Sequence, residues 1–415
     1  MSKLILKKAR HLEGDINIHG AKNAALPIIA ATLLTDNKCT LYSVPDLTDV
    51  ENMIEILKSL GYKVITNNSA YTIIPGKISS LKTSYEQTNK LRASFLIAGP
   101  LLAKYGEVKI SHPGGCQIGS RPVDLHLKGF EMLGAKIEKK HGYIDIKTDK
   151  LKGTKIYLDF PSVGATENLI MAASLANGET TLENCAVEPE IIDLANFINS
   201  MGGNVVGAGT DTIKIYGVKK LLGAEHTIIP DRIEAGTYMV AAAITKGKIK
   251  INNIIPDHLR PISAKMKEIG LEINENSNSI EIICDKILKP ADIKTLPYPG
   301  FPTDMQAQFT SLFSSVKGTS IVTETIFENR FQHVCELKRM GANIKIDGRC
   351  AVIEGAKLSG AKVMATDLRA GAALVLAGLS ADGQTEIDNA QVITRGYDNF
   401  VENLNSLGAS IKFIE

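Results

Sequence analysis

The sequence lacks a marked excess of either sign of charge, because 47 Lys and Arg residues face 45 Asp and Glu residues and leave a net charge of +2. This balance argues against a general nucleic-acid binder, and the 44% of hydrophobic residues argues against a disordered chain. Runs of 18 apolar residues that could span a bilayer are missing, as is a signal-peptide layout at the start. We therefore expect a soluble, cytoplasmic globular protein without a nucleic-acid or membrane partner.

Motifs for metal or cofactor binding are missing too. The eight histidines lie apart without HxxxH spacing, and the sequence has no P-loop, Rossmann fingerprint or nucleophile elbow. CxxC spacing is absent, which argues against zinc knuckles and a disulfide framework. We expect no metal and no cofactor, and we expect most of the six cysteines to be reduced, buried and inert: Cys39, Cys116, Cys185, Cys284, Cys335 and Cys350.

One pattern recurs through the chain, whose 415 residues exceed what a single hydrophobic core usually supports. An apolar strand, a polar loop and an amphipathic helix follow one another six times, and a glycine ends each helix. Glycine suits that position because a helix C-cap needs positive φ. The six copies cover residues 41–64, 110–137, 182–205, 251–273, 322–344 and 387–411, with Gly61, Gly134, Gly202, Gly270, Gly341 and Gly408 as the terminating glycines.

A second, more apolar helix is predicted upstream of each copy. Near-continuous Ala, Leu and Ile indicate that these helices are buried on most sides. Alternating strands such as residues 279–284 complete each unit. We predict an α/β protein of six repeated units in two three-unit domains, with the boundary near Ile229 and Pro230 and buried helices in residues 24–37, 91–106, 166–178, 233–247, 304–318 and 368–383.

Several phrases carry a resemblance to a known family: "GAKNAALP" at 20–27, "RPVDLH" at 121–126, "PSVGATEN" at 161–168, "FPTDMQAQ" at 301–308, "ENRF" at 328–331 and "TDLRAGAAL" at 366–374. Over nearly its whole length the chain closely resembles the UDP-N-acetylglucosamine 1-carboxyvinyltransferase family of enolpyruvyl transferases. The resemblance implies two inside-out α/β domains, with helices buried and sheets outward. It places the first domain at residues 22–229, with a lid loop that carries Cys116, and the second at 230–415, joined by residues 1–21.

The resemblance also implies an activity. Family members transfer the enolpyruvyl group of phosphoenolpyruvate to the 3'-hydroxyl of UDP-N-acetylglucosamine. The reaction proceeds by addition and elimination, releases phosphate and needs no metal, and it is the first committed step of peptidoglycan synthesis. One alternative is the shikimate-pathway enolpyruvyl transferase, which is not expected to carry the cysteine lid or the 121–126 loop. The other is a catalytically silent nucleotide-sugar regulator, against which Cys116, Lys22, Asp304 and Arg395 argue.

Cys116 lies in the polar, glycine-rich stretch "ISHPGGCQIGSRPVD". The residues alone leave open an incidental loop thiol or a reactive one, since Arg121 can lower the pKa of a nearby thiol and the glycines allow the segment to close over a ligand. The resemblance implies that Cys116 is the general acid toward the methylene carbon of phosphoenolpyruvate and can form a covalent adduct with it.

Lys22 and Asn23 stand just before the first buried helix, where unpaired N–H groups favour anions. Lys22 is therefore predicted to bind an anion rather than to be merely solvated. The resemblance implies that Lys22 contacts the phosphate of phosphoenolpyruvate and that Asn23 hydrogen-bonds the tetrahedral intermediate.

Arginines recur at loop or helix starts. Each alone resembles a surface charge, but guanidinium groups suit phosphate and carboxylate, and the implied substrates supply three phosphoryl groups and one carboxylate. We predict Arg121 and Arg395 as phosphoenolpyruvate ligands with Arg92 beside them, and Arg330 and Arg369 as site-shaping or closure residues. Arg232 is the remaining arginine of this set.

Asp304 is expected at the N-cap of a buried helix, where it would simply cap free N–H groups. The resemblance instead implies that Asp304 is the general base for the sugar 3'-hydroxyl, with Asp367 supporting the site from its symmetric place. A base and an acid of opposite protonation state are both needed, and Asp304 and Cys116 fill these roles.

The nucleotide site rests on the resemblance, because a generic loop-to-helix junction would look similar. Phe160 occupies a position where some relatives have a contacting Lys. Ile326 falls at a sugar-contacting position, and the residues implied to hold the uracil and diphosphate are Arg121, Pro122, Val123, Asp124, Leu125, Ser162, Val163 and Gly164.

Overall fold

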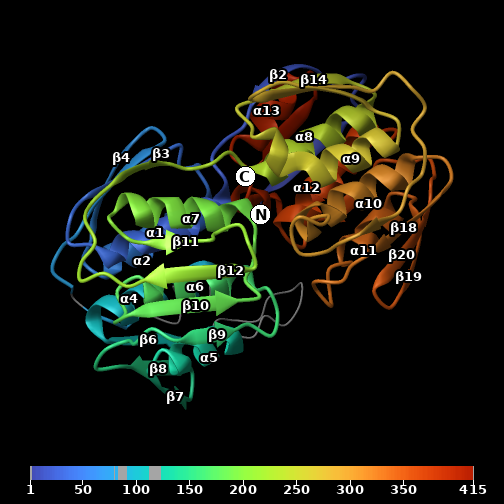
Figure 1. The fold of residues 1–415 in the computed structure, drawn as a ribbon. Helices are drawn as coiled ribbons and strands as arrows, with labels where there is room; N and C mark the ends of the chain where they lie inside the picture. The colour runs from blue at the N-terminus through green and yellow to red at the C-terminus, as the bar shows by residue number, and fades with distance from the viewer. Residues whose placement is uncertain (1, 79, 83–90, 112–122, 415) are drawn as a thin grey trace. The chain divides into compact units, whose positions relative to one another are not determined.

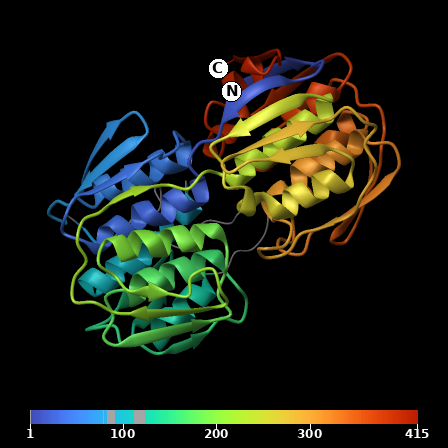
Figure 2. The ribbon, with the colours of Figure 1, turned by 45° about the horizontal axis from the view of Figure 1, so that its top comes forward.

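The computed structural model describes residues 2–78, 80–82, 91–111 and 123–414, with only the backbone of Arg92. The chain divides into two compact units (Figures 1 and 2). The first unit runs from Gly20 to Ile229, and the second combines the chain up to His19 with the chain from Pro230 onward. Each unit encloses its own hydrophobic core, and the two cores share no residue.

In the first unit, the inner helices α1 (Lys22–Ala31), α4 (Ala98–Tyr105) and α6 (Val163–Ala173) form the centre. The 3-10 helices η1 (Thr32–Leu34) and η2 (Arg92–Ile97) adjoin α1 and α4. Three sheets lie outside them, in the orders β13-β3-β5-β4, β6-β8-β7 and β11-β12-β10-β9. The outer helices are α2 (Thr48–Ser59), α5 (Asp124–Met132) and α7 (Pro189–Ser200). The strands are β3 (Cys39–Tyr42), β4 (Lys63–Asn67), β5 (Ala70–Ile74), β6 (Glu107–Ser111), β7 (Lys136–Lys140), β8 (Tyr143–Lys147), β9 (Lys155–Tyr157), β10 (Glu179–Glu183), β11 (Val205–Val206), β12 (Thr212–Tyr216) and β13 (Glu225–Thr227).

The second unit repeats this plan, with α8 (Arg232–Thr245), α10 (Gln306–Ser315) and α12 (Leu368–Ser380) packed on one another at its centre. Its sheets have the orders β15-β16-β14-β2, β17-β18-β20-β19 and β21-β22-β1-β23. The outer helices are α9 (Arg260–Glu268), α11 (His333–Arg339) and α13 (Phe400–Ser406), and the 3-10 helices are η3 (Pro256–Leu259), η4 (Thr303–Met305) and η5 (Ala390–Arg395). The strands are β1 (Lys3–Lys7), β2 (Glu13–Asn17), β14 (Lys248–Asn252), β15 (Glu272–Glu275), β16 (Ser279–Ile283), β17 (Ile293–Lys294), β18 (Thr319–Thr323), β19 (Asn343–Asp347), β20 (Cys350–Glu354), β21 (Lys362–Met364), β22 (Gln384–Asp388) and β23 (Ile411–Ile414).

The N-terminal strands complete two sheets of the second unit. β1 lies between β22 and β23 and is antiparallel to both, whereas β2 is parallel to β14. In the first unit, β13 pairs with β3 in the same parallel way. Without β1, the sheet β21-β22-β1-β23 would lose the strand that joins β22 to β23. This explains why the first residues of the chain belong with the last.

The repeat pattern predicted the local structure well. Small and apolar residues let the inner helices pack closely, and every residue of α8 from Ile233 to Thr245 is buried. All six predicted terminating glycines follow an outer helix with positive φ, between 89° and 110°. The prediction of six buried and six amphipathic helices is confirmed.

The cysteines depart in part from the expectation. Cys39, Cys185 and Cys284 are buried, but Cys350 is half-buried and Cys335 on α11 is exposed, because it lies on the solvent side of an amphipathic helix. Burial raises the pKa of the Cys185 thiol to about 12 and also raises the pKa of Cys39 and Cys284, so these three are poor nucleophiles. Within the described ranges, none of the helices has the length and apolar character needed to cross a membrane.

Candidate active site

Asp304 is the centre of a charged cluster in the second unit. Arg330 Nη2 donates to Asp304 Oδ1 at 2.7 Å, and Arg369 Nη2 donates to Oδ2 at 3.1 Å. The side chains of both arginines are almost fully buried, at 5% and 3% exposed, whereas that of Asp304 is 25% exposed. Two guanidinium groups therefore hold the carboxylate from the protein side and leave part of it accessible.

Glu324 organises the segment next to Asp304. Its buried carboxylate accepts hydrogen bonds from the hydroxyls of Thr295 (2.9 Å) and Thr303 (2.8 Å) and from the backbone N–H of Ile326 (2.8 Å). Arg330 Nη1 also donates to Thr303 Oγ1 at 2.8 Å. This network connects the half-buried Ile326, which is the predicted sugar contact, to η4 and so to Asp304.

The predicted position of Asp304 at the N-cap of a helix is wrong. Asp304 lies inside the 3-10 turn η4, and neither η4 nor α10 has a side-chain cap. The ion pairs with Arg330 and Arg369 orient its carboxylate instead. Capping is the role of Asp367, whose Oδ1 accepts from the backbone N–H groups of Arg369 (2.8 Å) and Ala370 (3.0 Å). Asp367 thereby anchors the turn of α12 from which Arg369 reaches Asp304.

Lys22 begins α1 in the first unit and is buried, with its Nζ 3.3 Å from Asp49 Oδ2 on α2. Because the Asp49 side chain is only 4% exposed, Lys22 is not a merely solvated lysine. Asn23 is half-buried beside it. The N-terminus of α1 has no side-chain cap and no acidic residue in its first turn, which suits an anion.

The two predicted nucleotide segments meet in the first unit. Asn168 Nδ2 lies 3.0 Å from His126 Nδ1, and the His126 ring lies against Gly164, where an added Cβ would come within 3.3 Å of it. Asn168 is buried and also bonds the Phe95 carbonyl and the Gly99 N–H, which joins α6 to η2 and α4. The starts of α5 and α6 are therefore held together as one surface.

The remaining predicted residues have varied surroundings. Val123 is buried, Leu125 is half-buried, and Asp124 is exposed with Lys139 Nζ 3.4 Å away. Ser162 caps α6 through Ala165 N–H, and Val163 begins that helix. Arg92 begins η2, Arg395 ends η5 and is half-buried, and Phe160 is 47% exposed. The predictions for Cys116, Arg121 and Pro122 lie outside the described residues.

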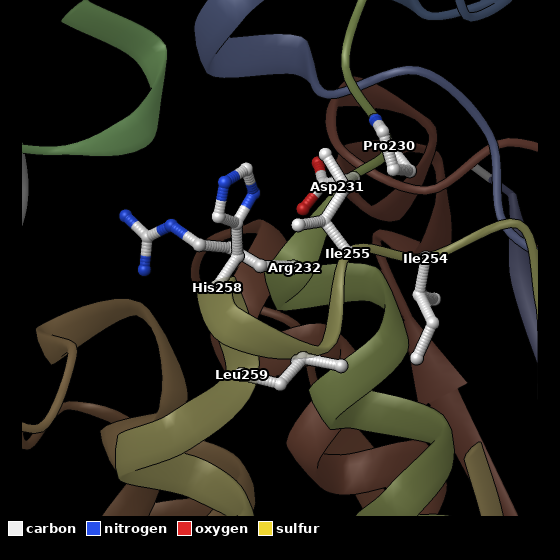
Figure 3. A pocket seen from close by; sticks show the side chains of 7 residues that line it. All are labelled: Pro230, Asp231, Arg232, Ile254, Ile255, His258 and Leu259. Carbon is white, nitrogen blue, oxygen red and sulfur yellow. The ribbon is translucent and has the colours of Figure 1, made fainter. Parts of the chain in front are cut away.

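A narrow pocket lies at the start of α8 (Figure 3). Its lining contains Arg232 but none of the residues around Asp304: it consists of Pro230, Asp231, Arg232, Ile254, Ile255, His258 and Leu259. In Figure 3 the Arg232 side chain extends away from Ile254. Arg232 also stacks on the Tyr298 ring, 5.5 Å from its centroid, so this arginine is separate from the pair that binds Asp304.

Sequence reasoning assigned no role to several residues that build the site. Glu324 lies four residues before the quoted phrase "ENRF", while Thr303, Gln308, His126 and Asn168 lie within quoted phrases. Tyr397, whose ring lies 5.2 Å from the Arg369 guanidinium carbon, follows Arg395 by two residues. Each of these residues lies within a few positions of a predicted ligand in the sequence, and this was the available signal of a role. Their contacts could not be predicted, because they join segments that are distant in sequence.

A family model described as EPSP synthase (3-phosphoshikimate 1-carboxyvinyltransferase) matches residues 6–404. The chain therefore belongs to this family of carboxyvinyl, or enolpyruvyl, transferases. Among curated relatives, it is 57% identical to UDP-N-acetylglucosamine 1-carboxyvinyltransferase 2 of Carboxydothermus hydrogenoformans over 99% of both chains. The protein of the same name from Clostridium tetani is also 57% identical over 99% of both chains, and UDP-N-acetylglucosamine 1-carboxyvinyltransferase of Halothermothrix orenii is 52% identical over 100% of both.

Solved structures show the same fold at much lower identity. The enolpyruvyl transferase NikO from Streptomyces tendae superimposes with a TM-score of 0.91 at 21% identity, covering 99% of this chain and 98% of that one. EPSP synthase from Acinetobacter baumannii gives a TM-score of 0.79 at 19% identity, with full coverage of both chains. The predicted enolpyruvyl transferase fold is confirmed.

Proposed function

We propose that this protein transfers the enolpyruvyl group of phosphoenolpyruvate to the 3'-hydroxyl of UDP-N-acetylglucosamine and releases phosphate. The full-length identity of 57% to proteins named for this reaction carries the proposal. The activity would open peptidoglycan synthesis and operate in the cytoplasm, on small-molecule substrates and without nucleic acid.

The chemistry proceeds by addition and elimination. In the addition, the 3'-oxygen bonds to C2 of phosphoenolpyruvate, its proton goes to a base, and the methylene carbon C3 gains a proton from an acid. In the elimination, C3 loses a proton, the C2–C3 double bond re-forms and the C2–O bond to phosphate breaks. Asp304 is our candidate base, and Cys116 is our candidate acid. The two arginines on Asp304 favour its ionised form, which a base requires.

Substrate binding is assigned to several groups. Lys22 and Arg395 would bind phosphoenolpyruvate with Arg92 and Arg121, and Asn23 would bond the tetrahedral intermediate. Arg330, Arg369 and Asp367 would support Asp304. The surface where α5 and α6 begin would hold the nucleotide: Arg121 to Leu125 and Ser162 to Gly164, with Ile326 against the sugar.

A phosphate-release assay tests the proposal. We expect phosphate only when phosphoenolpyruvate and UDP-N-acetylglucosamine are both present, and a nucleotide product that carries the added enolpyruvyl group by mass spectrometry. Phosphate release with shikimate 3-phosphate in place of the nucleotide sugar would establish the shikimate-pathway alternative. Binding of the nucleotide sugar without turnover of either acceptor would establish the regulator.

We predict that Lys22→Ala and Arg395→Ala each weaken phosphoenolpyruvate binding by about ten- to a hundredfold, because each removes a charge-assisted hydrogen bond worth about 1.5–3 kcal/mol. Calorimetry measures the affinity of each variant for phosphoenolpyruvate and for UDP-N-acetylglucosamine. Lys58→Ala is the control, since Lys58 is exposed and pairs only locally with Glu55 on α2. Reduced affinity for the nucleotide sugar, with phosphoenolpyruvate binding unchanged, would reverse the assignment.

A further inference from the structure

A closed ring of polar contacts lies behind Asp304 in the second unit. The Arg369 guanidinium binds the Asp304 carboxylate and lies over the Tyr397 ring, with 5.2 Å from Cζ to the ring centroid. Gln308 Nε2 lies 3.1 Å from the Tyr397 hydroxyl and 2.9 Å from the backbone carbonyl oxygen of Asp304. The contacts thus run from Asp304 through Arg369, Tyr397 and Gln308 back to Asp304.

The direction of each hydrogen bond in the ring follows from its neighbours. Thr237 Oγ1 donates to the Ile233 carbonyl at 2.8 Å, so it accepts from the Tyr397 hydroxyl, 3.0 Å away. Tyr397 then accepts from Gln308, whose second amide proton goes to the Asp304 carbonyl. Flipping the Gln308 amide would place two acceptors against each other at that carbonyl. Burial raises the pKa of Tyr397, so its hydroxyl keeps the proton that it donates.

This arrangement leaves a buried polar atom of Gln308 unpaired. Gln308 is 0% exposed, yet Gln308 Oε1 has no hydrogen-bond partner among the described residues. An unpaired buried polar group costs about 1–3 kcal/mol, so packing alone would favour an apolar side chain at such a position. Proteins accept such a cost mainly at functional sites, which supports a role for Gln308 beside Asp304.

We propose that Tyr397 and Gln308 are positioning residues for Asp304, an inference that rests on Asp304 being the base of the proposed function. Tyr397 sets the plane of the Arg369 guanidinium, which in turn directs the Asp304 carboxylate. Gln308 holds the Asp304 backbone in η4 and fixes the Tyr397 hydroxyl. Neither residue contacts the carboxylate itself.

The test uses Tyr397→Phe, which keeps the ring and removes the hydroxyl, and Gln308→Met, which keeps the length of the side chain without its donors. We expect kcat to fall about three- to tenfold in each, the effect of one hydrogen bond, with both KM values within about twofold of wild type. The acidic limb of the kcat profile should move to higher pH, because a carboxylate whose guanidinium neighbour is displaced takes up a proton more readily. Tyr238→Phe is the matched control, since Tyr238 is a fully buried tyrosine of α8 that packs on Phe400 as Tyr397 does.

A double-mutant cycle separates positioning from general destabilisation. If Tyr397 acts through Arg369, Tyr397→Phe should have little further effect on kcat in an Arg369→Lys background. Full additivity there, or a wild-type kcat and pH profile for Tyr397→Phe and Gln308→Met, would overturn the inference while leaving the proposed function intact. Turnover by Asp304→Asn at the wild-type rate would instead remove the base assignment on which the inference rests.

Discussion

Asp304→Asn is expected to lower turnover by about 10²- to 10⁴-fold, the usual contribution of a general base, while UDP-N-acetylglucosamine still binds. The amide preserves the shape of the side chain but cannot accept the proton of the 3'-hydroxyl. Its NH₂ group would also face one of the two arginines that now donate to the carboxylate, Arg330 or Arg369. Phosphate release measures turnover, calorimetry measures binding, and thermal unfolding checks that the variant folds.

Asp382→Asn is the matched control for this experiment. Asp382 is an exposed carboxylate of the second unit that also pairs with two cations, Lys8 at 2.8 Å and Lys357 at 2.6 Å. Hydrogen bonds from Lys357 and Lys8 lower its pKa to about 2, so the substitution removes an ionised, doubly paired carboxylate that has no role in the proposed chemistry. Its turnover should equal that of wild type. Asp304→Asn with wild-type-like phosphate release would refute the base assignment.

Cys116→Ser should lose most turnover, by a factor of about 10²–10⁴, because a serine hydroxyl is far too weak an acid to protonate a carbon. Cys116→Asp should retain activity, since a carboxylic acid can donate the proton. An epoxide phosphonate that mimics phosphoenolpyruvate should alkylate Cys116 in the wild type and spare Cys116→Asp, as mass spectrometry can show. The exposed Cys335 is the internal control for reactivity. Equal labelling of Cys335 and Cys116 would make Cys116 an ordinary loop thiol.

The sequence by itself determined the local structure and the repeat. Inner helices are recognisable because they are apolar on nearly all sides, and outer helices because they are amphipathic. Glycines such as Gly61 and Gly408 mark helix ends because positive φ is a local backbone demand, with values here of 104° and 101°. These features depend on residues within a few positions of one another, and the structure confirms them. The residue pattern indicated that Lys22 binds an anion, whereas the resemblance supplied the identity of that anion and the role implied for Asp304.

Only the tertiary structure decided how these pieces combine. The two arginines on Asp304 come from positions 26 and 65 residues away, and β1 pairs with a strand whose residues lie 377 to 385 positions away along the chain. Asp304 and Asp367 each stand close to the start of an inner helix, yet only Asp367 caps one. Local propensity allows both carboxylates to cap, but buried guanidinium groups offer Asp304 stronger, charge-assisted hydrogen bonds, and these partners are brought to it only by folding.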